Sequence, residues 1–161
     1  MIETILVPEE RAKVINAKVI ARVWDTKGIK VTLEGNAVNM EGEGIEMLAA
    51  KSFLKAIGRG FSPIRANRLL EDEEAQLEIV ELDFGEKRLR TVRSRLIGSG
   101  GKTRALLEEC TGAVVSIYGN TAALIGSWAQ VRNARQAVEM LISGSMHKGV
   151  YRFLESVKEK V

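Results

Sequence analysis

The chain has 161 residues, of which 45% are hydrophobic and 28% charged, and its formal net charge is +3. These values predict a globular protein of one large or two small domains, and the apolar stretches are far shorter than the roughly 20 residues that span a bilayer. One cysteine and one histidine exclude an internal disulfide and a Cys/His zinc cluster, and they disfavour Ser-His-Asp and Cys-His catalysis. We expect a cytoplasmic, non-enzymatic protein with no membrane contact, no metal and no cofactor.

Charge is distributed unevenly along the chain. Residues 1–85 hold 11 basic and 15 acidic residues, whereas residues 86–152 hold 11 basic and 4 acidic ones. The excess of positive charge in residues 86–152 favours binding of a polyanion by this segment, and residues 1–85 then have a different function. A basic surface that only keeps the protein soluble explains the same numbers, so charge alone leaves both interpretations open.

A first set of elements is predicted in residues 1–58. The pattern indicates a strand over 3–7, two helical stretches that end at Gly28, and a hairpin of strands 29–33 and 37–41. A helix follows Gly42, and its apolar positions recur every three or four residues: Ile45, Leu48, Ala49, Phe53, Ala56 and Ile57. The order of elements is therefore β-α-α-β-β-α.

The same order recurs 84 residues later. Strands are predicted over 77–83, 113–118 and 121–125, with two helical stretches after the first and a helix after the last. Identical pairs at this offset include Gly28 and Gly112, Val31 and Val115, Gly35-Asn36 and Gly119-Asn120, Gly42 and Gly126, Ala50 and Ala134, and Gly60 and Gly144. The repeat predicts two α+β modules, each with helices on one face of a three-stranded sheet.

The domain boundaries follow from this repeat. The first module occupies residues 1–58, and residues 59–76 form a linker with a short helix over 66–70. The second module occupies residues 77–146, and residues 147–161 form a helical tail.

A glycine-rich loop lies between the two early helices of the second module. Three of the four residues from Gly98 to Gly101 are glycines, and uncovered backbone N–H groups at a helix N-terminus favour phosphate. A P-loop would need glycine at Leu96, and the dinucleotide-binding fingerprint would need glycine at Thr103. A nucleotide-dependent enzyme that uses residues 101–103 is therefore the weakest interpretation.

The sequence I-G-x-x-G at the start of a helix within β-α-α-β-β-α resembles the type I KH domain, which clamps four nucleotides of single-stranded RNA or DNA. Residues 95–126 and 150–155 resemble the tandem-KH ribosome-assembly proteins of archaea and eukaryotes, the partner-of-Nob (Krr-like) proteins. The resemblance implies an RNA-binding factor for ribosome biogenesis and rRNA processing, which binds the 3′ region of small-subunit rRNA and assists 3′-end maturation. It also implies contact with the endonuclease that trims this end and with the alpha subunit of translation initiation factor two.

The candidate RNA-binding residues lie in the second module. They are the loop, its flanking basic residues, the apolar groove floor and the turn expected to face the loop: Arg93, Arg95, Ile97, Gly98, Ser99, Gly100, Gly101, Lys102, Thr103, Arg104, Leu107, Val115, Tyr118 and Asn120. Tyr118 either stacks on a base or covers the sheet. The resembled family usually carries a basic residue at Ser99 and a glycine at Ser94, which implies a weaker phosphate contact here.

The first module has lost the loop. Residues 14–17, Val-Ile-Asn-Ala, stand where the second module has its glycines. Side chains and acidic surroundings predict that this module packs against its twin or binds protein partners instead of clamping nucleic acid. A protein-interaction adaptor with a vestigial G-x-x-G loop is the alternative function.

Four single residues have simpler interpretations. Cys110 is expected to fill the core, and His147 is expected to lie in a solvated loop. Trp24 and Trp128 stand at helical positions and are expected to pack.

Overall fold

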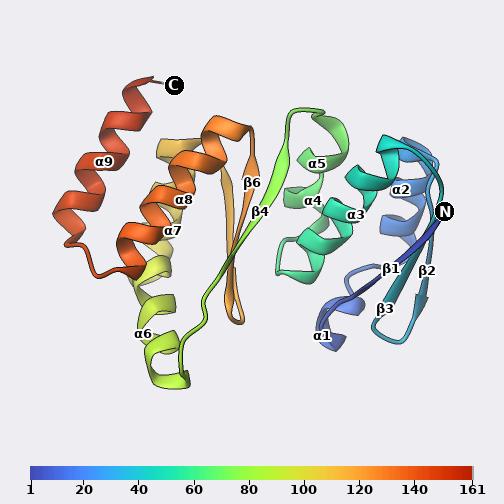
Figure 1. Cartoon of the computed structure of the whole chain (residues 1–161), viewed down its shortest axis with the longest axis horizontal. Coiled ribbons are helices and arrows are strands. Elements are labelled where there is room, and N and C mark those ends of the chain that lie inside the picture. Colours follow the sequence, from blue (N-terminus) through green and yellow to red (C-terminus); the bar gives the residue numbers. More distant parts are fainter. Residues whose placement is uncertain (161) are drawn as a thin grey trace. The chain divides into compact units, whose positions relative to one another are not determined.

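The computed structural model describes residues 1–160 and divides the chain into two compact units, one of residues 1–75 and one that begins at Gln76 (Figure 1). Each unit contains one three-stranded antiparallel sheet, with the helices of that unit on one side of it (Figure 1). The expected α+β class and the order of two type I KH modules are confirmed. None of the described helices is long and apolar enough to cross a membrane.

The first unit begins with a strand and two helices that precede a hairpin. Its elements are β1 (Ile2–Leu6), α1 (Glu9–Ala12), α2 (Ala17–Lys27), β2 (Lys30–Glu34), β3 (Ala37–Glu41), α3 (Ile45–Gly58), α4 (Pro63–Ala66) and α5 (Arg68–Glu71). The strand order is β1-β3-β2, so the last strand is central. Gly28 ends α2 with φ +66°, a left-handed conformation that glycine adopts without strain.

The second unit repeats this plan. Its elements are β4 (Gln76–Glu81), α6 (Glu86–Ile97), the 3-10 turn η1 (Ser99–Gly101), α7 (Lys102–Thr111), β5 (Val114–Tyr118), β6 (Thr121–Gly126), α8 (Trp128–Ile142) and α9 (His147–Lys160). The strand order is β4-β6-β5, which matches the first sheet. Every residue of the central strand β6 is buried.

Helix α9 is part of the second unit's core. Val150, Leu154 and Val157 are buried at spacings of four and three residues, which is one face of a helix. This face packs on α7 and α8. The segment expected as a helical tail is therefore attached to α7, the helix that follows the glycine-rich loop.

Phe53, Ala56 and Ile57 of α3 are buried as expected, but the first turns of the helix differ from the expected apolar face. Ile45 and Leu48 are 75% and 63% exposed, whereas Met47, Ala50 and Leu54 are buried. The buried stripe runs one position away from the expected one at the start of the helix, and both stripes obey the same three- and four-residue spacing. Periodicity alone could not choose between them.

Two other expectations differ from the structure. Residues 59–75 lie within the first unit, because α4 and α5 pack on α3 and bury Phe61, Leu69 and Leu70. The two tryptophans are exposed, and the Arg132 guanidinium lies 4.7 Å from the centre of the Trp128 ring. For Trp128, this cation–π contact takes the place of the packing that we expected from the sequence.

Candidate nucleic-acid interface

The glycine-rich loop requires glycine for two different reasons. Gly98 has φ +75°, and a Cβ there would collide with the side chain of Thr103 and lie 2.8 Å from its backbone nitrogen. Gly100 and Gly101 have φ +61° and +78°, and a Cβ on either would meet nothing within 4 Å. The loop is therefore tightly packed at its start and open at its end.

This turn leaves backbone donors available to a ligand. It closes through a hydrogen bond from the Gly101 N–H to the Gly98 carbonyl, at 3.1 Å. Ser99 and Gly100 lie between the two residues that this bond joins, and their N–H groups have no acceptor within the turn. Helix α7 begins after Gly101 with no side-chain cap, and Lys102 is exposed in its first turn. These donors, the helix dipole and the ammonium group make the turn a candidate anion site.

The equivalent turn of the first unit is closed. The Asn16 side chain caps α2 by accepting a hydrogen bond from the Val19 N–H, at 3.1 Å. Ile15 is 1% exposed and belongs to the core. The Asn16 side chain therefore occupies a backbone donor in the first turn of α2, whereas no side chain caps α7.

Arg95 has a different role from the expected phosphate contact. Its guanidinium donates to the carbonyl oxygens of Leu141, at 2.7 Å, and Ser145. In the first unit, Arg11 donates to the carbonyls of Ile57 and Phe61, at 2.8 and 2.7 Å, and each of these three residues lies 84 positions before its counterpart. This duplicated clamp ties the end of α3 or α8 to the connection that follows it, because one carbonyl lies in the last turn of the helix and the other lies beyond it.

Three other expected contact residues are buried in the second unit. Thr103, Leu107 and Val115 are 2%, 0% and 1% exposed. Leu107 and Val115 belong to the core, as expected of an apolar groove floor, and their contact with RNA stays a prediction. Thr103 lies close to Gly98 and shapes the start of the loop.

The remaining basic and polar candidates stay at the surface. The Arg104 guanidinium lies 3.4 Å from the Val115 carbonyl and 3.7 Å from the Glu108 carboxylate, at the edge strand β5. Tyr118 is half-buried at the end of β5, and Asn120 is exposed in the turn that follows. Their contact with RNA stays a prediction.

A hollow of about 450 Å³ lies along α6 before the loop. Arg93 and Ile97 line it together with Glu86, Leu89, Arg90 and Ser94. The Nε atom of Arg93 is buried and has no hydrogen-bond partner among the described residues, and such an atom is costly to leave unpaired. This face of α6 therefore offers a further donor beside the candidate anion site.

A second hollow, of about 480 Å³, lies between the loop and α9. Loop residues Gly98, Ser99 and Lys102 line one part of it, and His147 and Tyr151 of α9 line another. Sequence reasoning missed both aromatic residues, since it placed His147 in a solvated loop. The packing of α9 on α7 brings them to the site.

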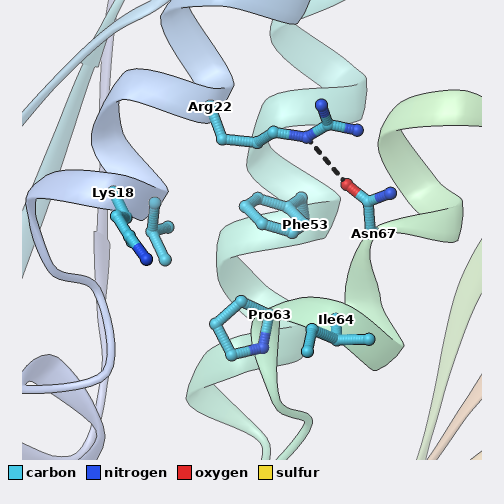
Figure 2. A pocket seen from close by; sticks show the side chains of 7 residues that line it. Lys18, Arg22, Phe53, Pro63, Ile64 and Asn67 are labelled. Carbon is cyan, nitrogen blue, oxygen red and sulfur yellow. Dashed lines mark hydrogen bonds between the residues drawn. The ribbon is translucent and has the colours of Figure 1, made fainter.

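The first unit has a hollow at the equivalent place, of about 280 Å³ (Figure 2). Lys18, Pro63 and Asn67 line it, and they lie 84 positions before Lys102, His147 and Tyr151. Phe53 stands behind them, and Arg22 donates to the Asn67 side-chain oxygen at 3.0 Å (Figure 2). The repeat therefore preserves the hollow. In the first unit Phe53, Pro63 and Ile64 give it an apolar part, and the counterparts of His147 and Tyr151 are not aromatic.

Comparison with known proteins finds relatives along nearly the whole chain. Residues 76–159 match the model of the second KH domain of PNO1, described as a eukaryotic type KH-domain (KH-domain type I). The chain is 33% identical to a KH domain-containing protein of Methanocaldococcus jannaschii, over 99% of this chain and 75% of that protein. It is 26% identical to the pre-rRNA-processing protein PNO1 of Debaryomyces hansenii, and it spans about half (53%) of that protein's length.

Solved structures agree with this result. Dim2p of Pyrococcus horikoshii OT3 is 39% identical, with a TM-score of 0.88 over 97% of this chain and 99% of that one. A chain in the a/eIF2alpha-aDim2p-rRNA complex of the same organism is 36% identical, with a TM-score of 0.92 over 100% of this chain and 96% of that one. Identity and shared fold over this length show that the chain belongs to the PNO1/Dim2 family of KH-domain ribosome-assembly proteins.

Proposed function

We propose that the chain binds the 3′ region of small-subunit rRNA as single-stranded RNA, through its second KH module, and assists maturation of that end. The observation that carries this proposal is the uncapped three-glycine turn at the start of α7. A KH domain holds four nucleotides of a single strand on such a turn. The related Pyrococcus chain with rRNA in its complex supports the same ligand.

Each surface residue has a part in this proposal. The N–H groups of Ser99 and Gly100 and the ammonium of Lys102 contact phosphate, which positions the strand without reading its sequence. Arg93 and Ile97 on α6 contact the neighbouring nucleotides. Bases are read at the edge strand β5, near Arg104, and at the turn that holds Tyr118 and Asn120.

The protein acts by binding and not by catalysis. The names of its relatives describe RNA binding and pre-rRNA processing, and its family is defined by an RNA-binding domain. Its role in 3′-end maturation is then to present the RNA to the endonuclease. Contact with the alpha subunit of translation initiation factor two is proposed from the resemblance, and the Pyrococcus complex supports it.

A binding experiment tests this function. Full-length protein is titrated into fluorescently labelled RNA from the 3′ end of 16S-type rRNA, and into RNAs of equal length from other segments, with anisotropy as readout. Tighter binding to the 3′ segment is expected. Equal binding to all segments would remove the 3′ specificity, and absence of binding would favour the protein-interaction adaptor. A matched titration with the purified alpha subunit, followed by gel filtration, tests the protein partner.

A further inference from the structure

We propose that the hollow between the glycine-rich loop and α9 binds one nucleobase of the RNA strand, stacked on Tyr151. The inference rests on the proposed function and adds a subsite to it, because it places a nucleotide in a hollow other than the one along α6. The ligand class is a purine or pyrimidine ring attached to the strand whose phosphate the loop holds.

The position of the hollow favours a nucleotide. Gly98, Ser99 and Lys102 belong both to the anion site and to the lining of this hollow. Ser94 lines this hollow and also the one along α6, so the two adjoin at that residue. A strand with one phosphate on the loop therefore has a neighbouring nucleotide on each side.

The chemistry of the lining suits a base. Tyr151 is 40% exposed, and its ring centre lies 5.9 Å from that of His147, with the ring planes tilted by 60°. The two rings stand one turn apart on α9, and exposed aromatic rings stack on bases irrespective of sequence. The hydroxyls of Thr91 and Ser99 also line the hollow and can bond the edge of the base.

The rings are held in place before any RNA arrives. Arg95 binds the carbonyls of Leu141 and Ser145, which fixes the end of α8 and the connection to α9. Val150, next to Tyr151, is fully buried. The start of α9 is therefore fixed to the core that also carries the loop, and a preorganised site spends little binding energy on ordering.

The first unit supplies the contrasting case. The positions equivalent to His147 and Tyr151 hold Pro63 and Asn67, beside the turn closed by Asn16. The aromatic pair thus accompanies the open turn and is absent where the turn is closed. A general packing role for aromatic residues at this place does not explain the difference.

An abasic scan of the RNA tests the proposal with full-length protein. The probe is a labelled single strand of about ten nucleotides from the 3′ end of 16S-type rRNA, with one base removed at a time. Tyr151→Ala is expected to weaken binding of the intact strand about tenfold, as for loss of one base–aromatic stack. At one position outside the four nucleotides of the groove, removal of the base should cost the wild-type protein about tenfold and cost Tyr151→Ala nothing further.

Two variants control for structure. Tyr151→Phe keeps the ring and should bind like the wild-type protein, and Trp128→Ala removes an exposed aromatic ring that does not line this hollow. Unchanged affinity in Tyr151→Ala would overturn the proposal, as would a loss that every abasic strand shares equally. If the wild-type protein binds none of these RNAs, the proposed function itself fails and the subsite fails with it.

Discussion

The two modules share a sequence repeat, a strand order and an arginine clamp, and they differ at one turn. In the second module that turn is built of glycines and leaves helix α7 uncapped, whereas in the first module Asn16 caps α2. Each module nevertheless has a three-stranded sheet and a buried core. The KH fold therefore does not depend on the open turn. Packing on Thr103 explains Gly98, and the open space around Gly100 and Gly101 suits close approach of a ligand.

The hollow beside the turn changes in the same direction. In the second module it is lined by Lys102, hydroxyls and two aromatic rings, and in the first by Val19, Phe53 and Pro63 with cations at the edge. The lining of the second hollow suits a polyanion, and the first hollow is the more apolar of the two. The opposite net charges of residues 1–85 and 86–152 follow the same division.

Removal of the clamp arginine should give the largest loss of stability, and the loss should be equal in the two modules. Arg11→Met and Arg95→Met each remove two hydrogen bonds from a charged donor, and we expect each to lower the free energy of unfolding of its own module by about 3 kcal/mol. Hydrogen exchange resolved by residue measures each module separately, because two units need not unfold together. A loss confined to RNA affinity in Arg95→Met, with stability intact, would restore Arg95 as a phosphate contact.

Helix capping should distinguish the modules by stability. Asn16→Ala removes the side-chain cap of α2 and should destabilise the first module by about 1 kcal/mol. Asn16→Asp retains an acceptor and serves as the control. If Asn16→Ala leaves hydrogen exchange of the first module unchanged, the cap does not stabilise the closed turn.

The equivalent lysines should differ in their effect on RNA binding. Neutralisation of three to five phosphates predicts a slope of about −2 to −3.5 in log K against log salt for single-stranded RNA. Lys102→Ala should make this slope shallower by about 0.7 and weaken binding severalfold, whereas Lys18→Ala, its counterpart in the first module, should change neither. Equal effects of the two substitutions would mean that both modules contact RNA.

The reactivity of Cys110 reports on the core of the second module alone. Burial raises the pKa of the Cys110 thiol, an effect that Lys158 opposes, and the thiolate is the reactive form. Iodoacetamide at pH 8 should therefore modify the native protein at least about tenfold more slowly than the unfolded chain. Rapid modification of the native protein would contradict the assignment of this residue to the core.

The sequence alone predicted the repeat, the order of elements and the open turn, since glycine spacing and hydrophobic periodicity are local signals. It did not reveal the partners of Arg95, which lie 46 and 50 residues away and become visible only when the chain folds. The identity of Arg11 and Arg95 at the repeat offset could have indicated a structural role. His147 and Tyr151 were missed because the packing of α9, and no local motif, brings them to the loop.

The central claim is that the open turn of the second module holds the RNA backbone. Ser99→Asp with Gly100→Asp places two carboxylates on this turn and leaves Gly98 and its contact with Thr103 intact. RNA affinity of the full-length protein, measured by anisotropy, is predicted to fall at least about tenfold, or roughly 1.4 kcal/mol, because like charge replaces a donor surface. Unchanged affinity in a folded double variant would contradict the account and leave the loop vestigial.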